Sequence, residues 1–445
     1  MNILLIQPPL NENLVGSGVL YLPEPLALET IAAGVLDKHN VKILDMRIDK
    51  LLKEDLDTFK PDIVGITALT PDVYAACEIF ENIKKFNKDV ITVVGGHHPT
   101  LIPEDFNKAC IDFVVIGEGQ ATFSEIVDAV EFKKDFSKIK GIGIQENCKL
   151  KITQERDFME NLDDMPFPVR HLTKKYREKY FRAAWRPVAS LLTSRGCPFR
   201  CNFCAVWKHE RGRYRLRSAE SIVKEIQTIE EPYISICDDN FLHDVNRAEK
   251  LYELLKEKGI KKTYKLIARS DTIVKHPDLI AKWKEIGAEM VLLGIESFRD
   301  EELKVFNKSN SVKNNEEAIN ILHQNNITVV AQFIVNPDYL EKDFIELGDY
   351  VEKMNLPHPI FSVLTPLPGT DLYHERYKEF VTYNYNLFDF IHSIFPTKLP
   401  REKFYECLAD LYLRTYTKGS AGKSVPVSKP IYEQLYMSIK EAYKY

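Results

Sequence analysis

The sequence predicts an α/β protein with two parallel-sheet domains, one following the other along the chain. Short apolar stretches alternate with helical patterns of about 10–15 residues, first in the N-terminal part and again in the middle of the chain. Because parallel strands are joined by crossovers that are usually helices, this alternation indicates parallel sheets. The 445 residues are long enough for about two to four domains with substantial hydrophobic cores.

Residues 1–135 predict a doubly wound parallel sheet. The expected strands are Asn2–Gln7, Val41–Asp45, Ile63–Thr67, Val90–Gly95 and Phe113–Gly117. Helical patterns at 26–36, 71–86 and 122–132 lie between them. In sheets of this kind, ligands bind beside the carboxyl ends of the strands.

Residues 136–186 are less regular, and we interpret them as a linker that contains a hairpin. Apolar residues at 141–145 and 150–153 flank a polar turn, which is typical of two antiparallel strands. Asp163–Pro168 follows as an extended stretch punctuated by proline. We therefore expect this segment to separate the two domains.

Residues 187–370 repeat the alternation and predict a partial (β/α)6 barrel. The expected strands are Val188–Thr193, Tyr233–Cys237, Lys265–Arg269, Met290–Gly294, Val329–Ile334 and Ile360–Leu364. Barrels of parallel strands keep their chemistry at the carboxyl ends of the strands. Residues 371–445 are rich in aromatic side chains at helical spacing, with a flexible joint expected at Lys418–Lys423.

The composition excludes several classes of function. Sixty basic and sixty-five acidic residues leave a net charge of -5, so the chain lacks the basic field that holds a nucleic acid. Hydrophobic residues make up 44% and charged residues 28%, which is typical of globular proteins. We see neither an export signal nor an uncharged apolar stretch of the roughly 18 residues that a membrane span needs. We therefore expect a cytoplasmic protein with no nucleic-acid partner and no membrane span.

Three of the eight cysteines, Cys197, Cys201 and Cys204, fall within eight positions of one another. In a chain without an export signal, such spacing indicates metal or redox chemistry before disulfides. A structural zinc ion takes four protein ligands, so a zinc knuckle completed by His209 is one alternative. An iron–sulfur cluster held by three thiolates would leave one iron open to another ligand.

The CxxxCxxC spacing, with Phe203 before the last cysteine, resembles the signature of the radical S-adenosylmethionine (SAM) enzymes. The resemblance implies that the three cysteines bind a [4Fe–4S] cluster, that SAM chelates its open iron, and that a 5′-deoxyadenosyl radical forms. It also implies SAM contacts at the ends of the next three strands, from Asp238, Asp239, Asn240, Arg269 and Glu296. The chain departs from the family at residues 333–338, where relatives commonly carry a glycine-rich turn.

The loops after the N-terminal strands contain neither a GxGxxG turn after the first strand nor a P-loop. They resemble the cobalamin-binding, Rossmann-like domain that precedes the barrel in many radical SAM enzymes. The cofactor contacts that this resemblance implies are Thr67, Leu69, Gly95, Gly96, His97, His98, Glu118 and Gly119. The DxHxxG motif, whose histidine ligates cobalt in other cobalamin proteins, is replaced by Gln7–Asn11. We therefore expect cobalamin without a histidine ligand below the cobalt.

Together these resemblances predict a cobalamin-dependent C-methyltransferase acting on an unactivated carbon of a small-molecule or lipid-like substrate. The cofactors perform such chemistry, so no catalytic side chain is nominated. The expected partners are that substrate and an electron donor such as flavodoxin or ferredoxin. The aromatic tail is similar to the C-terminal segment of some methylases of this family, including those acting on hopanoid lipids, or forms a helical cap on the barrel.

Two alternatives to methyl transfer stay open. One is oxidative ring formation or rearrangement without methyl transfer, as in the anaerobic magnesium-protoporphyrin monomethyl ester cyclase family, which the sequence also resembles. The other is a cobalamin-responsive sensor in which the cluster is structural.

Overall fold

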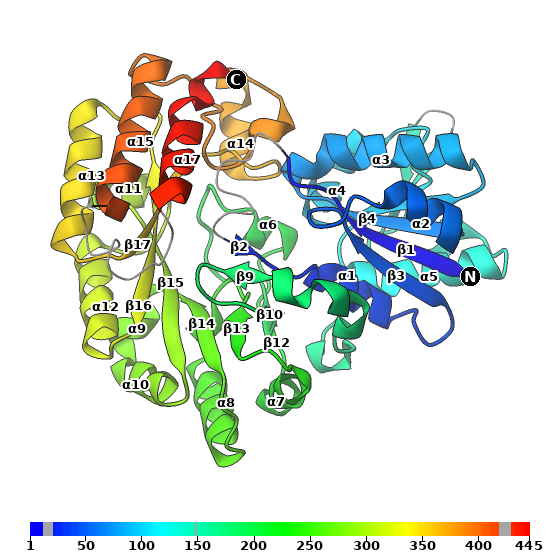
Figure 1. The fold of residues 1–445 in the computed structure, drawn as a ribbon, viewed down its shortest axis with the longest axis horizontal. Coiled ribbons are helices and arrows are strands. Elements are labelled where there is room, and N and C mark those ends of the chain that lie inside the picture. Colours follow the sequence, from blue (N-terminus) through cyan, green and yellow to red (C-terminus); the bar gives the residue numbers. More distant parts are fainter. Residues whose placement is uncertain (12–20, 147–148, 418–428) are drawn as a thin grey trace. The chain divides into compact units, whose positions relative to one another are not determined.

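The computed structural model describes residues 1–11, 21–146, 149–417 and 429–445, which form two compact units (Figure 1). The first unit contains the N-terminal strand, Glu24–Lys179 and the short segment Asn384–Asn386. The second contains Tyr180–Tyr383 and Leu387–Tyr445. The joint expected at Lys418–Lys423 lies outside the described residues.

The first unit is built on a seven-stranded sheet with the order β3-β1-β4-β5-β6-β7-β8. Its strands are β1 (Asn2–Gln7), β3 (Asn40–Asp45), β4 (Ile63–Thr67), β5 (Ile91–Gly95), β6 (Phe113–Val115), β7 (Ile142–Glu146) and β8 (Lys149–Ile152). The first five of these pair in parallel, and β7 and β8 add antiparallel strands at one edge. The hairpin expected in the linker is therefore part of this sheet, and the first unit continues to Lys179.

Helices cover both faces of the first sheet. They are α1 (Leu26–Ala33), α2 (Leu52–Phe59), α3 (Val73–Phe86), α4 (His97–Leu101) and α5 (Gly119–Glu131). Ile3 and Leu5 of β1 belong to one buried cluster with residues of α1 and α5, whereas Leu4 and Ile6 belong to another with residues of α2 and α3. Both faces of β1 are thus buried, which explains why this strand is a continuous apolar run.

The chain order reverses at β1, which lies between β3 and β4. After β3 on one side of β1, the chain crosses to β4 on the other and continues outward to β5 and β6. Such a switch point opens a crevice at the carboxyl ends of the strands, where doubly wound sheets bind their ligands. The predicted cofactor loops after β4, β5 and β6 all lie at this edge.

The second unit contains six parallel strands in sequence order, β10-β13-β14-β15-β16-β17. They are β10 (Val188–Leu191), β13 (Tyr233–Ile236), β14 (Thr263–Ala268), β15 (Ala288–Glu296), β16 (Thr328–Val335) and β17 (His358–Val363). The helices between them are α7 (Ala219–Thr228), α8 (Val245–Glu257), α9 (Ser270–Lys275), α10 (Pro277–Glu285), α11 (Asp300–Val305), α12 (Val312–Gln324) and α13 (Glu341–Lys353). Within the described residues β10 and β17 do not pair, so this is an open, partial barrel, as expected.

The tail covers the last barrel strand. Its helices are α14 (Asp371–Arg376), α15 (Arg401–Thr417) and α17 (Lys429–Lys440). The Tyr412 hydroxyl of α15 accepts a hydrogen bond from the Phe361 amide (3.0 Å) and donates one to the Phe361 carbonyl (2.8 Å). Tyr416 donates to the Pro359 carbonyl at 2.7 Å. Part of the edge of β17 is therefore satisfied by tyrosines of the tail instead of another strand.

Among the helices that the structure describes, none combines the length and the apolar character that crossing a bilayer requires.

Candidate functional site

The three clustered cysteines lie in the loop that follows β10 and the short strand β11 (Ser194–Arg195). All three are free thiols, and Cys201 is buried. Burial raises the pKa of each thiol, that of Cys204 to about 12. A bound metal deprotonates such thiols, so three thiols of one loop are a suitable donor set for an iron–sulfur cluster.

Asp238, at the end of β13, braces the start of this loop. The carboxylate is fully buried, and its oxygens accept hydrogen bonds from the Thr193 amide (2.6 Å), the Thr193 hydroxyl (2.5 Å) and the Ser194 hydroxyl (2.5 Å). Arg247 donates to the Thr193 carbonyl at 2.7 Å and lies 3.7 Å from the Asp238 carboxylate. Both oxygens of Asp238 therefore bind the loop, and this residue fixes the position of the segment that leads into the three cysteines.

Asp239 binds the same loop from the next position. It accepts a hydrogen bond from the Gly196 amide at 3.1 Å, immediately before Cys197. Burial and the neighbouring Asp238 charge raise the pKa of Asp239 to about 6, despite the hydrogen bond from the Gly196 amide. Asp238 and Asp239, which the sequence suggested as SAM contacts, thus both hold the cysteine loop in the structure.

A second segment braces the far side of the cysteine loop. The Asn202 amide donates to the Phe306 carbonyl at 3.2 Å, and the Asn307 side chain donates to the Arg200 carbonyl at 2.8 Å. The rings of Phe203 and Phe306 meet edge to face, with their centres 5.7 Å apart. Phe203, the aromatic residue of the motif, therefore packs against the segment that follows α11.

Arg269 follows β14 and lies against the cysteine loop. Its guanidinium is 3.5 Å from the centre of the Phe199 ring, and it donates to the carbonyls of Lys308 (3.0 Å) and Ser309 (3.2 Å). It also pairs with Asp271 at 3.0 Å. Arg269 thus places a positive charge beside the motif, where a carboxylate of SAM could be held.

Asn240 has a feature that indicates a ligand. The residue is fully buried, yet neither its amide nitrogen nor its amide oxygen has a hydrogen-bond partner among the described residues. An unsatisfied buried polar group costs about 1–3 kcal/mol, so proteins rarely keep one without a use. A molecule that both donates and accepts, as the amino acid portion of SAM does, fits this side chain.

Glu296 ends β15 in a strained conformation. Its φ is +63°, in the left-handed region, and the pairing of β15 with β16 shifts register between Gly294 and Glu296. The Glu296 carboxylate pairs with Lys308 at 2.6 Å. A Cβ at Gly294 would lie 2.5 Å from this carboxylate, so a larger residue there would displace the pair. Strain of this kind costs about 1–3 kcal/mol and is concentrated at functional sites.

In the first unit, the Gly95–Gly96 turn fits closely against the loop after β4. Gly96 has a φ of +116°, and a Cβ there would lie 2.8 Å from the Ala68 carbonyl and 3.0 Å from the Thr67 hydroxyl. The Ala68 amide donates to the Gly95 carbonyl at 2.8 Å. Leu69, next in the loop, is 54% exposed and free to contact a ligand at this edge.

The two predicted histidines have different surroundings. His97 is exposed at the start of α4. His98 is buried, and its ring nitrogens lie 2.8 Å from Asp105 and 3.2 Å from the Thr70 hydroxyl. Its ring also meets that of Tyr385, with the centres 4.8 Å apart. Both nitrogens of His98 therefore have partners within the unit.

The remaining loop residues follow β6. The Glu118 carboxylate accepts a hydrogen bond from the Met159 amide at 2.7 Å, and Gly119 begins α5. Sequence reasoning missed the residues that hold this edge from elsewhere, above all Met159 and Tyr385. These residues carry no motif, because each acts through its backbone or ring and not through a characteristic spacing.

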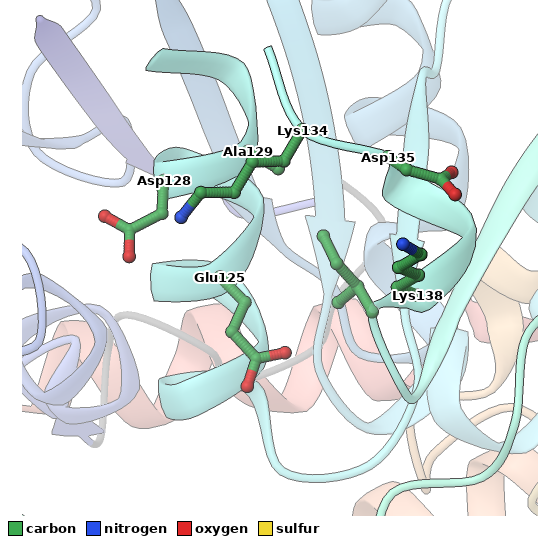
Figure 2. A pocket seen from close by; sticks show the side chains of 7 residues that line it. Glu125, Asp128, Ala129, Lys134, Asp135 and Lys138 are labelled. Carbon is green, nitrogen blue, oxygen red and sulfur yellow. The ribbon is translucent and has the colours of Figure 1, made fainter. Parts of the chain in front are cut away.

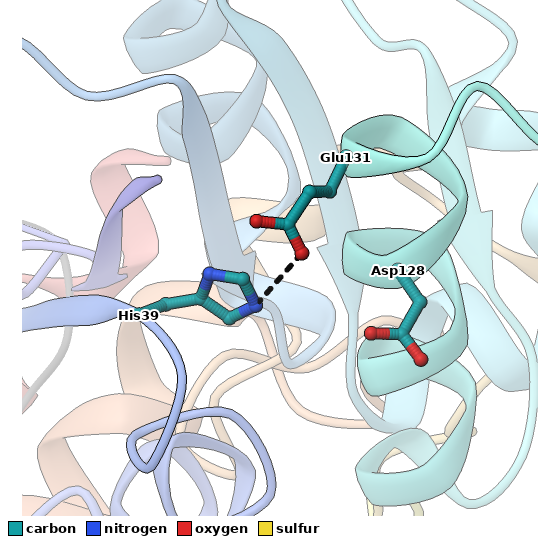
Figure 3. Close-up of side chains that lie close together, drawn as sticks. All are labelled: His39, Asp128 and Glu131. Atoms are coloured by element: carbon teal, nitrogen blue, oxygen red, sulfur yellow. Dashed lines mark ion pairs between the residues drawn. The ribbon is translucent and has the colours of Figure 1, made fainter.

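A cluster of charged side chains and a hollow both involve residues of α5, away from the cofactor edge. His39, Asp128 and Glu131 bring their ligand atoms within 4.8 Å of one another, and His39 is 4.0 Å from Glu131 (Figure 3). Figure 2 shows a hollow between α5 and the following turn, lined by Glu125, Asp128, Ala129, Lys134, Asp135, Lys138 and Ile139. His39 precedes β3, at the amino ends of the strands, so neither feature belongs to the cofactor loops.

Each of the two units matches a model of a known protein family. The model of the radical SAM superfamily matches residues 191–351, and that of the B12 binding domain matches residues 13–127. The chain is 31% identical over 397 residues to the hopanoid C-3 methylase of Methylococcus capsulatus, covering 86% of this chain and 74% of that protein. It is 29% identical over 386 residues to the anaerobic magnesium-protoporphyrin IX monomethyl ester cyclase of Rubrivivax gelatinosus, covering 82% and 67%.

A solved structure has the same architecture. The cobalamin-dependent SAM radical enzyme OxsB, with aqua-cobalamin bound, superposes with a TM-score of 0.74 over 100% of this chain and 72% of that one, at 18% identity. This likeness concerns the fold, and it confirms the expected order of a cobalamin-binding domain and a radical SAM barrel. A [4Fe–4S] cluster, SAM and cobalamin are accordingly the cofactors of this enzyme. The chain belongs to the cobalamin-binding radical SAM enzymes, a family that includes both methyltransferases and cyclases.

Proposed function

We propose that the protein is a C-methyltransferase that moves a methyl group from methylcobalamin to an unactivated carbon of a small-molecule or lipid-like substrate. The observation that carries the proposal is the braced three-cysteine loop, in a chain that is 31% identical to a methylase over most of its length. When bound, the cofactors supply a 5′-deoxyadenosyl radical for hydrogen abstraction and a methyl group for transfer.

The residues of the barrel have two roles, which are to bind the cofactors and to position the residues that bind them. Cys197, Cys201 and Cys204 would ligate the cluster, and Asp238 sets the position of their loop. For SAM we propose contacts from the amide of Asn240, which has no partner in the described part of the chain, from Arg269 and from Glu296. No general base is needed, because hydrogen abstraction replaces proton removal.

In the first unit, the loops after β4 and β5 are proposed to hold cobalamin. The Gly95–Gly96 turn lies close against Thr67 of the neighbouring loop, which leaves a surface over which a large flat ligand can lie. Among the histidines, we assign His97 to the ligand edge, because it is exposed there whereas His98 is buried. A small redox protein such as flavodoxin or ferredoxin is the proposed electron donor.

Anaerobic turnover with methyl-deuterated SAM tests the proposal. Reconstituted enzyme is incubated with a metabolite extract and a reductant, and products are compared by mass. We expect a product heavier by 3 Da than that from unlabelled SAM, as follows from three deuterons replacing three hydrogens. A Cys201→Ala variant, which lacks one cluster ligand, should form neither this product nor 5′-deoxyadenosine.

The same experiment distinguishes the second candidate, ring formation or rearrangement, which the relationship to the cyclase favours. A product that forms together with 5′-deoxyadenosine but carries no label would refute methyl transfer and support this second activity. If cells producing Cys201→Ala kept the full cellular function, a sensor with a structural cluster would replace both.

A further inference from the structure

The inner face of the barrel sheet carries several partly exposed side chains. Every second residue along each strand points to the helices and is buried, as Leu266, Val291 and Phe361 are. Residues of the opposite, inner face keep partial exposure in four neighbouring strands, namely Ile267, Leu292, Gln332 and Ile360. Three of these four side chains are apolar, and this part of the face is accessible.

Lys265 is a charged residue on this face. Tyr264 and Leu266, its neighbours in β14, belong to the core against the helices, so Lys265 points the other way. The side chain is only 2% exposed, and it makes no hydrogen bond or ion pair within the described residues. An isolated buried ammonium is costly, and a lysine in such a place is retained for a purpose or loses its proton.

The second polar group is next to it. Ser235 of β13 is the register partner of Lys265, and its hydroxyl is buried without a hydrogen-bond partner among the described residues. On the other side, the register partner of Lys265 is Met290 of β15, an apolar residue. Two adjacent strands thus present an amine and a hydroxyl that have no partner among the described residues, on a face that also carries the apolar Ile267 and Leu292.

The charges around Lys265 are few. Burial and the positive charge of Arg182 lower the pKa of Lys265 to about 7, against the opposing effects of Cys237 and Asp238. Arg182 belongs to β9 (Phe181–Arg182), while Cys237 and Asp238 follow β13. On the other side of Lys265, β15 contributes the apolar Met290 at this level.

The chemistry of this pair defines the ligand. A lysine offers three donors and no acceptor, and a serine hydroxyl adds one donor. A carboxylate accepts several hydrogen bonds and gains charge assistance from the ammonium. The apolar surroundings favour a ligand whose remaining part is hydrocarbon.

We propose that Lys265 and Ser235 form a substrate subsite inside the barrel, which binds a carboxylate carried by an apolar molecule. The inference rests on the proposed function, because it names the class of its substrate. Arg269, the proposed SAM contact, lies on the same face of the chain four positions later, or about 13 Å at the rise of a strand. A carboxylate held by Lys265 would therefore anchor the substrate at a fixed distance from SAM.

Matched probes test the subsite without turnover. Octanoate and 1-octanol share the same chain length and differ in the carboxylate, and their binding to the holoenzyme is measured by calorimetry at pH 6.5. We expect octanoate to bind at least tenfold more tightly than octanol. Lys265→Met should reduce octanoate affinity to that of octanol, whereas Lys261→Met, an exposed lysine of the preceding loop, should change neither.

A second variant and a pH series give independent readouts. Ser235→Ala should weaken octanoate several-fold and leave octanol unchanged, even if Lys265→Met were to fold poorly. Because only the protonated amine attracts the anion, octanoate affinity of the wild type should fall as the pH rises above 7, and this slope should disappear in Lys265→Met. Cys237→Ser should keep the slope, which excludes the nearby thiol as its source.

Two results would overturn the subsite. One is wild-type enzyme that binds octanoate no more tightly than octanol, and the other is Lys265→Met that keeps the preference. Since these measurements require neither product nor label, they stay interpretable if methyl transfer itself is refuted.

Discussion

Among individual residues, Asp238 and Asn240 lie two positions apart after the same strand, yet their surroundings differ. Asp238 has every oxygen engaged by the loop before the cysteines, whereas Asn240 has both amide atoms unengaged among the described residues. A buried side chain whose hydrogen bonds are all made within the protein stabilises the fold, whereas one with unmade hydrogen bonds is available to a ligand. The two therefore predict opposite mutational results.

Asp238→Asn should impair cluster assembly. The amide nitrogen would face the hydroxyl donors of Thr193 and Ser194. The substitution would also leave the buried charge of Arg247 without its partner, which costs about 3–5 kcal/mol. We expect a lower iron content after reconstitution and a lower midpoint of thermal unfolding. Asp239→Asn, which alters a single hydrogen bond to Gly196, is the comparison and should lower the iron content less. Equal iron in both variants would contradict the positioning role.

Asn240→Leu should weaken SAM without weakening the fold. Leucine is close in shape to asparagine and removes two unsatisfied buried atoms, so stability without SAM should stay the same or rise by about 1–3 kcal/mol. Affinity for SAM, measured by equilibrium dialysis on the reconstituted enzyme, should fall at least tenfold. Unchanged SAM affinity would show that Asn240 has no part in the site.

At the scale of elements, the tail helix α15 acts as the neighbour of edge strand β17. One hydroxyl, that of the buried Tyr412, serves both backbone groups of Phe361. Burial raises the pKa of Tyr412, so the hydroxyl keeps its proton. The tail therefore completes the barrel, whatever else it contacts.

Tyr412→Phe tests this completion. The variant leaves the Phe361 amide and carbonyl without their partner, which should lower the free energy of unfolding by about 2–4 kcal/mol. Tyr436→Phe, which removes a hydrogen bond to Asp410 on an exposed surface, should cost less than about 0.5 kcal/mol. Urea denaturation of the two variants provides the comparison, and equal midpoints would contradict the role of Tyr412.

The parallel strands of both sheets were predictable, because buried apolar runs and helical crossovers determine them locally. The hairpin at 142–152 was also recognised, but its membership of the first sheet depends on the pairing of β6 with β7, which no local pattern reveals. The same limit applies to the site. Spacing identified the cysteines, whereas the bond between Asp238 and Thr193 joins residues 45 positions apart and follows only from the parallel neighbours β10 and β13.

For the whole molecule, the division of the chain does not follow the order of the sequence. Asn384–Asn386 belong to the first unit although the barrel precedes them. Tyr385 packs on His98 and stacks on Tyr74, with ring centres 6.1 Å apart. Asp105 is paired with His98. Burial acts to raise the pKa of Asp105, but hydrogen bonds from His98 and Tyr385 lower it.

Tyr385→Ala should loosen α4 and leave the barrel unchanged. Loss of this ring should destabilise the loops around His98 by about 1–3 kcal/mol, visible as faster amide hydrogen exchange in His97–Leu101. Exchange in α12 and α13 should not change. Tyr383→Ala, an exposed tyrosine two positions earlier in the second unit, is the matched control. Equal protection of α4 in both variants would refute the contribution of Tyr385.

The late arrival of Tyr385 also affects how the protein is made. A ribosome adds about 5–20 residues per second, so this residue is synthesised roughly 10–40 s after Lys179, the last residue of the main part of the first unit. During that interval the loop around His98 lacks one of its aromatic partners while the barrel is being synthesised. The cobalamin-binding unit begins folding first, but it acquires its complete set of side chains only when almost the whole chain exists.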